Sequence, residues 1–136
     1  MPTLARWYIK TALAWLIAGL AAGVAIHLPI TRLPSAALQP VYIHFLVLGW
    51  LTQLIFGVAY WMFPKVSLER PRGHESLAVA AYVLLNVGLA ARGIGEPMLT
   101  LAPGPDARGL VLASAVLPWL GVMAFIANAW PRVRGS

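Results

Sequence analysis

Four long apolar stretches constrain this chain more than any other feature. They cover about residues 7–28, 41–63, 76–91 and 109–130, and none of them contains Asp or Glu. About 20 apolar residues are enough for one helix to cross a bilayer. Lipid offers no hydrogen-bond partners to a bare backbone, so such stretches must be helices and not open strands. We therefore expect an all-α fold, an integral membrane four-helix bundle that forms one domain over 1–136.

Composition agrees with this expectation and excludes several other classes. Of the 136 residues, 60% are hydrophobic and 10% are charged, whereas about a quarter of the residues in a soluble domain are charged. Four spans use nearly the whole chain and leave no room for a soluble domain. The absence of cysteine excludes disulfides and thiolate metal sites. The net charge of +6 gathers at the ends of the stretches, so topology explains it better than a nucleic-acid partner does.

Orientation follows from the distribution of Lys and Arg, which are enriched on the cytoplasmic side of membrane proteins. One side carries seven of them, namely Arg6, Lys10, Lys65, Arg70, Arg72, Arg132 and Arg134, and the other carries three, namely Arg32, Arg92 and Arg108. We therefore expect both termini to be cytoplasmic in a cell inner membrane. Arg6 and Lys10 before an apolar run also fit a secretory signal, but this run is long enough to span.

Polar side chains at membrane depth are few, and none is acidic. They are His27, His44, Thr52, Gln53, Asn86, Ser114 and Asn128. The lack of acids inside the spans argues against a proton-coupled carrier or an ion pump. A small transporter is also disfavoured, because the sequence shows no pair of broken helices. We expect Asn86 to hydrogen-bond a neighbouring helix. The two histidines are the most informative members of the set.

His44 stands at the head of an aliphatic helix face. At about 100° per residue, it shares that face with Leu48, Leu51, Ile55 and Met62, while the opposite face carries Gly49, Gln53, Gly57 and Tyr60. The small residues predict a packing seam on the opposite face. An imidazole facing lipid would lose hydrogen bonds, at a cost of a few kcal/mol. Either the His44 imidazole hydrogen-bonds to a neighbouring helix, or it ligates the iron of a heme against which the leucines pack.

His27 and Arg92 are the other candidates for the same site. His27 closes the first span at nearly the depth of His44, with Gly23 one turn before it, so two imidazoles could meet one heme. Alternatively, His27 binds water or headgroups at the interface. Arg92 ends the third span at that depth, where its planar guanidinium could pair with heme propionates or with lipid headgroups. Gly19 and Gly23 form a GxxxG pair, which favours close helix packing.

One stretch resembles a known family. Residues 42–50, YIHFLVLGW, continued through Gly57, Tyr60 and Pro64, resemble the second helix of heme–copper oxidase subunit I, in the branch of cbb3-type oxidases and nitric oxide reductases. The resemblance covers about 23 residues well and is generic elsewhere. It implies that His44 is an axial ligand of a low-spin heme b and that the N-terminus is cytoplasmic.

The departures from that family limit what the resemblance implies. Subunit I takes its second low-spin ligand, and the histidines of its copper and high-spin heme, from later helices that this chain lacks. The chain therefore resembles a stand-alone version of the first four helices, and reduction of oxygen or nitric oxide by the chain alone is not implied. The second axial ligand would be His27, His44 of a second copy in a homodimer, or none.

Two functional hypotheses follow from these observations. The first is a heme b-binding membrane protein that acts in electron transfer, in sensing of nitric oxide or another diatomic gas, or as an accessory to a respiratory complex. The second is a cofactor-free accessory or assembly subunit that packs beside a terminal oxidase or a nitric oxide reductase. The number of axial ligands separates the roles within the first hypothesis, because iron with both axial sites filled passes electrons but binds no gas without losing a ligand.

Overall fold

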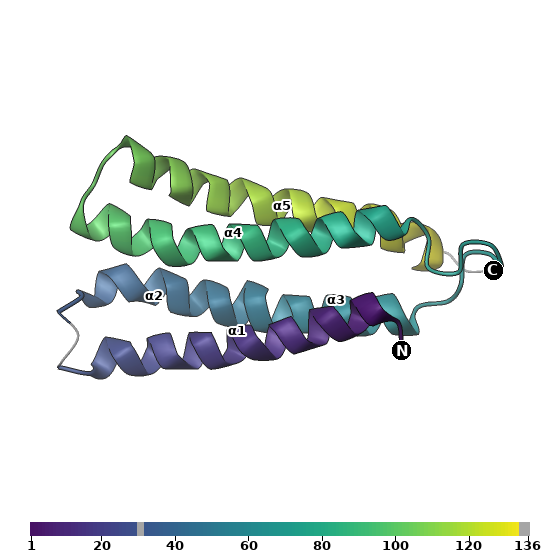
Figure 1. Ribbon diagram of the computed structural model, residues 1–136, viewed down its shortest axis with the longest axis horizontal. Helices are drawn as coiled ribbons and strands as arrows, with labels where there is room; N and C mark the ends of the chain where they lie inside the picture. Colours follow the sequence, from purple (N-terminus) through teal and green to yellow (C-terminus); the bar gives the residue numbers. More distant parts are fainter. Residues whose placement is uncertain (30–31, 134–136) are drawn as a thin grey trace.

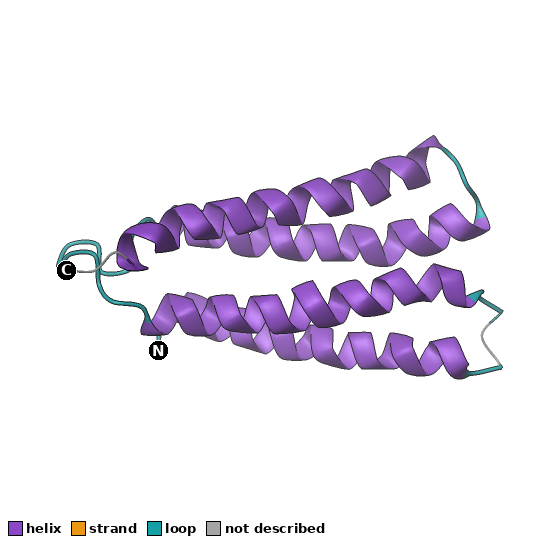
Figure 2. Ribbon diagram, turned by 180° about the vertical axis from the view of Figure 1, so that it is seen from behind, coloured by secondary structure: helices purple, strands orange, loops and turns teal. Residues whose placement is uncertain are grey.

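The computed structural model describes residues 1–29 and 32–133 and forms a bundle of four antiparallel helical rods (Figure 1). The rods are α1 (Thr3–His27), a composite second rod of α2 (Ser35–His44), η1 (Phe45–Thr52) and α3 (Gln53–Met62), then α4 (Glu75–Leu101) and α5 (Pro105–Val133). No strand occurs in the two described ranges (Figure 2). All four rods are long and apolar enough to cross a membrane. The expected all-α, four-helix class is confirmed.

The start of α1 and the end of α5 lie at one end of the bundle, as an even number of antiparallel rods requires (Figure 1). We call this the terminal end, and it also carries the connection between α3 and α4. The opposite end, which we call the far end, carries the connection between α1 and α2 and that between α4 and α5.

Large apolar side chains cover the outside of the rods. Ile17 on α1 is 71% exposed, and Leu112 on α5 is 66% exposed. An aqueous surface rarely presents so much contiguous apolar area. The four rods are therefore suited to a lipid surround, in agreement with their length and hydropathy.

The second rod is continuous but changes register in its middle. The π-helical segment η1 follows directly after His44, and the Thr52 hydroxyl donates to the carbonyl of Val47, five residues earlier, at 2.8 Å. Turns of this kind are rare and are frequent at functional sites. The change of register begins at His44 and ends before Gln53, so it separates the far half of the rod from its terminal half.

Glycines form the seam between α1 and the second rod. A Cβ built on Gly49 would lie 2.7 Å from Cβ of Trp15, and one on Gly57 would lie 2.8 Å from Cβ of Tyr8. From the α1 side, a Cβ on Gly23 would lie 2.8 Å from the ring of Tyr42. The two rods can approach this closely only because glycine has a hydrogen atom in place of Cβ. The predicted seam of small residues, including the GxxxG pair, is confirmed.

Polar bonds join α1 to α4 across the bundle. The Tyr8 hydroxyl donates to the carbonyl of Ala78 at 2.8 Å, and the Trp15 indole donates to the Asn86 amide oxygen at 2.7 Å. A third bond at 2.7 Å joins the hydroxyls of Thr11 and Tyr82. Asn86 is thus the interhelical link that the sequence predicted.

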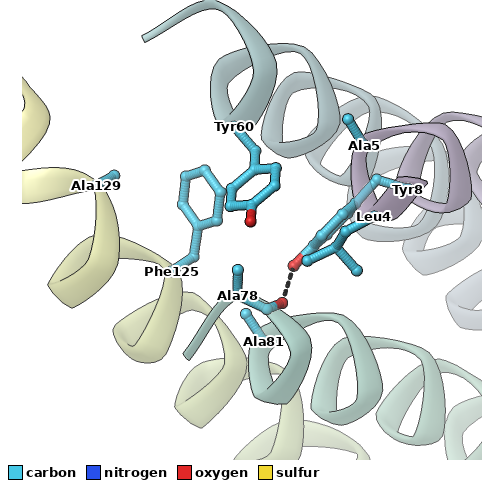
Figure 3. Packing of buried hydrophobic residues seen from close by; sticks show 8 residues of the cluster. All are labelled: Leu4, Ala5, Tyr8, Tyr60, Ala78, Ala81, Phe125 and Ala129. Atoms are coloured by element: carbon cyan, nitrogen blue, oxygen red, sulfur yellow. Dashed lines mark hydrogen bonds between the residues drawn. The ribbon is translucent and has the colours of Figure 1, made fainter. Parts of the chain in front are cut away.

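The aromatic core lies near the terminal end. Tyr8, Tyr60 and Phe125 are buried there among small residues of α1 and α4, as Figure 3 shows. Phe125 also stacks on Phe56, with ring centroids 3.8 Å apart and planes 3° apart. The two rings join α3 to α5 in the terminal half, and both border a hollow of about 370 Å³ along α5.

Arg132 is buried at the same end, although its charge helped to predict topology. It is 2% exposed, and its guanidinium donates to the carbonyls of Tyr60, Phe63 and Pro64 at 2.7–3.1 Å. Tyr60 lies in the last turn of α3, and Phe63 and Pro64 follow the end of the helix, so none of these carbonyls has a partner within it. The last turn of α5 therefore caps the C-terminus of α3, where the helix dipole favours a cation.

The third rod corrects one expectation. The sequence predicts a span that ends near residue 91, five residues before Glu96, yet α4 continues to Leu101. Arg92 and Glu96 form an ion pair one turn apart inside the helix, so their charges are neutralised there. Gly95 lets α4 pack against Leu110. The helix therefore extends past the predicted span and contains Glu96, which the span did not include.

Pro118 lies within α5, which continues through it. Proline lacks the amide that would bond to the carbonyl of Ser114, so α5 is without that helical hydrogen bond here. The Pro118 ring packs on Gly88 of α4, and a Cβ on Gly88 would collide with it. Gly88 therefore accommodates the proline where α4 and α5 cross.

Candidate functional site

A hollow of about 350 Å³ lies between the second rod, α4 and α5. Its walls come from His44 and Leu48, from Arg92, and from five residues of α5, namely Ser114, Ala115, Pro118, Trp119 and Val122. The hollow is within the size range of small-molecule pockets, about 300–1,000 Å³, and like them it is mainly apolar with a few convergent polar groups. It is the place where His44 and Arg92, both predicted from the sequence, come together.

The polar groups of this hollow share one depth in the bundle. His44, Arg92 and Ser114 each lie nine residues from the far end of their helix, since α2 begins at Ser35, α4 ends at Leu101 and α5 begins at Pro105. At 1.5 Å per residue, this places them roughly 13–14 Å below that end. Three side chains from three rods therefore form one polar layer well inside the far half.

His44 is held by its own helix in a defined tautomer. Its Nδ1 lies 2.7 Å from the carbonyl oxygen of Pro40. A carbonyl only accepts hydrogen bonds, so Nδ1 carries the proton and donates it. The neutral ring then keeps its lone pair on Nε2, which has no hydrogen-bond partner among the described residues. Such orientation by a backbone carbonyl is typical of histidines that bind metals.

Arg92 borders the same hollow, and only part of its guanidinium group is paired. Its side chain is 11% exposed and pairs with Glu96 through one guanidinium nitrogen. Its Nε is buried and has no hydrogen-bond partner in the structure. A buried donor without a partner is costly and calls for an explanation. An anionic group bound in the hollow would supply the missing acceptor.

The wall from α5 was not identified from the sequence. The Ser114 hydroxyl donates to the carbonyl of Val111 at 2.6 Å, so it is already satisfied within its helix. Trp119 borders the hollow while remaining 61% exposed, so the hollow opens toward the lipid-facing surface on that side. No sequence signal selected Trp119 among the six tryptophans, because its partners come from another rod.

His27 lies elsewhere. It is the last residue of α1, and it borders a separate hollow of about 620 Å³ with Gln39 and Tyr42. Its Nδ1 bonds to the carbonyl of Gly23 at 2.9 Å, in the same manner as His44. Because α2 starts at Ser35, His27 lies at the far end, whereas His44 lies well inside the bundle. The structure does not bring the two imidazoles together.

The arrangement around His44 can bind a flat apolar ligand that carries a metal and an anionic group. The Nε2 atom of His44 is free to ligate, and the aliphatic residues provide an apolar wall. Arg92 offers an unpaired donor at the same depth. Heme has these properties, since its iron takes imidazole ligands and its propionates suit a guanidinium. The residues present therefore fit the cofactor that the sequence suggested.

Histidines and acids do not cluster further in the part of the chain that the structure describes. No group of three or more His, Cys, Asp or Glu residues lies close enough to hold a metal ion between 1–29 and 32–133. At the His44 hollow, the chain therefore offers one metal ligand, the His44 imidazole. A porphyrin needs no more, because its four nitrogens already hold the iron.

Comparison with known proteins yields no match: no protein-family model, no curated protein and no solved structure matches this chain.

Proposed function

We propose that this protein is a heme b-binding membrane protein with His44 as an axial ligand. The observation that carries the proposal is the bond from Nδ1 of His44 to the Pro40 carbonyl. It leaves Nε2 as the ligating atom, on the wall of a hollow bordered by Leu48 and Arg92. The resemblance of residues 42–64 to the second helix of heme–copper oxidase subunit I supports the same assignment.

Each residue of the hollow would make a different contact with the heme. His44 would hold the iron, and the Pro40 carbonyl would keep the ring in the orientation and tautomer needed. Leu48, Val122 and Pro118 would exclude water from the macrocycle. Arg92 would pair with a propionate through the nitrogen that Glu96 leaves free.

Bound heme would supply one-electron redox chemistry and, at an open axial position, binding of a diatomic gas. His44 is the ligand that the chain itself provides in this hollow, and His27 is remote from it. The second position would therefore remain open or be filled by His44 of a second copy. The open case favours gas binding, and the filled case favours electron transfer to or from a respiratory complex.

An optical spectrum tests this proposal. The protein is purified after expression with ample heme, and we expect a Soret band that is lost in His44→Ala. His27→Ala is the matched control, because that histidine has the same bond to the carbonyl four residues earlier but borders another hollow. His74→Ala is a second control, since His74 is exposed just before α4.

The same spectra distinguish the alternatives. Wild-type protein that is colourless, yet folded by its helical circular dichroism, would contradict heme binding and favour a cofactor-free accessory subunit. A Soret band that survives in His44→Ala but disappears in His27→Ala would assign the site to the α1 hollow instead. Addition of carbon monoxide to the reduced protein shows whether an axial position is open.

A further inference from the structure

A polar pocket of about 310 Å³ lies at the terminal end, away from the His44 hollow. The segment before α4 forms one side of it, and Tyr60 of α3 forms another. The charged residues on its walls are Glu69, Arg70, Arg72, His74 and Glu75. Neither the resemblance nor the heme proposal involves this pocket.

The first turn of α4 leaves donors unused at the pocket. The N-cap residue His74 makes no side-chain capping bond. The amides of Leu77 and Ala78 bond to the carbonyl of His74, but those of Glu75 and Ser76 have no acceptor among the described residues, and both residues border the pocket. The N-terminus of a helix attracts anions through such amides and through its dipole.

Tyr60 gives a second, independent sign of a ligand. The residue is only 2% exposed, and its hydroxyl has no hydrogen-bond partner in the described ranges, although the residue borders the pocket. In Figure 3 this hydroxyl points toward the first turn of α4, where Ala78 lies. Tyr8, its neighbour in the core, does have an acceptor for its hydroxyl. The Tyr60 hydroxyl is not one of the fully buried unpaired atoms of the described chain, so the pocket that the residue borders is where a ligand could reach it.

The charges of the pocket select the kind of ligand. Arg70 and Arg72 would attract a phosphate, but Glu69 and Glu75 offset them, and none of the four lies in an ion pair of the described chain. A plain dianion would therefore meet as much repulsion as attraction. A group that carries a phosphate and an ammonium ion would satisfy both signs.

We propose that this pocket binds the phosphoethanolamine headgroup of a membrane lipid. The phosphate would lie between the arginines, the Tyr60 hydroxyl and the first amides of α4, and the ammonium ion would lie against the glutamates. The position suits a lipid, because the pocket lies where α3 ends and α4 begins, at the level expected for headgroups if the four rods span a bilayer. The charge count places this end at the cytoplasmic leaflet.

Lipid retention tests the proposal. The purified, delipidated full chain is exchanged into mixed micelles of phosphatidylethanolamine, phosphatidylcholine and phosphatidylglycerol, and the lipids that stay bound are counted by native mass spectrometry. We expect phosphatidylethanolamine to be retained about tenfold over the other two, because charge-assisted hydrogen bonds to both signs are available only to it. Arg70→Gln, Arg72→Gln and Tyr60→Phe should each reduce retention of phosphatidylethanolamine, because each removes a phosphate contact. Glu69→Gln and Glu75→Gln should reduce the preference for phosphatidylethanolamine, because the glutamates contact the ammonium ion that phosphatidylglycerol lacks.

Matched controls separate the pocket from a general positive surface. Arg6→Gln and Lys65→Gln remove one exposed charge each at the same end but do not border the pocket, so they should leave the preference intact. Tyr60→Phe keeps the backbone carbonyl that Arg132 caps, and Arg70 is exposed, so these two variants should fold even if Arg72→Gln does not.

Three outcomes would overturn the proposal. Equal retention of the three lipids would show that the pocket does not select the headgroup. Equal losses in Arg6→Gln and Arg70→Gln would assign binding to net charge. Displacement of phosphatidylethanolamine by millimolar inorganic phosphate, but not by O-phosphoethanolamine, would mean that the pocket binds free phosphate and not a lipid.

Discussion

The two ends of the bundle are built differently. At the terminal end, aromatic rings pack between the rods, Arg132 closes the C-terminus of α3, and the polar pocket lies beside this core, in the segment before α4. At the far end, polar side chains border hollows that the neighbouring rods do not fill, one beside His44 and another beside His27. Packing in the terminal half therefore holds the rods together, and the far half can keep a hollow between the second rod, α4 and α5.

Removal of the buried arginine should have the largest effect on stability. Arg132→Met deletes the donors to three carbonyls at the end of α3, and leaving buried groups unpaired costs about 3 kcal/mol or more. Thermal unfolding in detergent measures the loss. Arg108→Met, at an exposed site of α5, is the control. Equal stability of the two variants would show that the terminal end does not carry the fold.

A substitution at the middle of α4 should have the next largest effect. Gly88 lies thirteen residues from each end of that helix, and Gly88→Ala would drive a methyl group into the Pro118 ring. Overpacking of this kind costs about 1–3 kcal/mol. Gly109→Ala is the matched control, because a Cβ on Gly109 meets nothing within 4 Å. A stable Gly88→Ala protein would mean that α4 and α5 separate easily in both halves.

A change in the far half should affect ligand retention and not stability. Arg92→Gln removes the cation with the unpaired Nε, and losing a charge-assisted bond should lower heme affinity about tenfold. Titration of heme into apoprotein, followed by the Soret band, measures this. Glu96→Gln keeps Arg92 and frees its guanidinium, so it should bind heme at least as tightly as the wild type. Parallel losses in both variants would indicate that the ion pair only supports the helix.

The smallest effect should come from the bond between Trp15 and Asn86. A double-mutant cycle with Trp15→Phe and Asn86→Ala isolates its energy, and such interhelical bonds in membranes are worth about 0.6 kcal/mol on average. Unfolding in detergent gives the four stabilities required. A coupling near zero would show that the contact between α1 and α4, 2.7 Å long in the structure, contributes nothing to holding the two halves together.

Part of the candidate site could be predicted because it depends on one helix at a time. His44 was singled out from its place on an apolar face, and its bond to Pro40 spans only one turn. The partners from α5 could not be predicted, since the approach of Trp119 to the hollow depends on how α5 lies against α4. Glu96 was placed outside the helix because glycines and a proline surround it, although Arg92, four residues earlier, was the signal that could have extended α4.

The amino-acid order by itself determined the four apolar rods, the glycine seam of the second rod and the helix that carries His44. These follow from local periodicity and from the cost of exposing backbone to lipid. The tertiary structure alone decided that Arg132 caps another helix, that Arg92 joins His44 while His27 does not, and that the Tyr60 hydroxyl faces the pocket without a hydrogen bond in the described ranges. Those facts depend on how far each rod extends and how it is rotated against its neighbours, and packing between distant segments sets both.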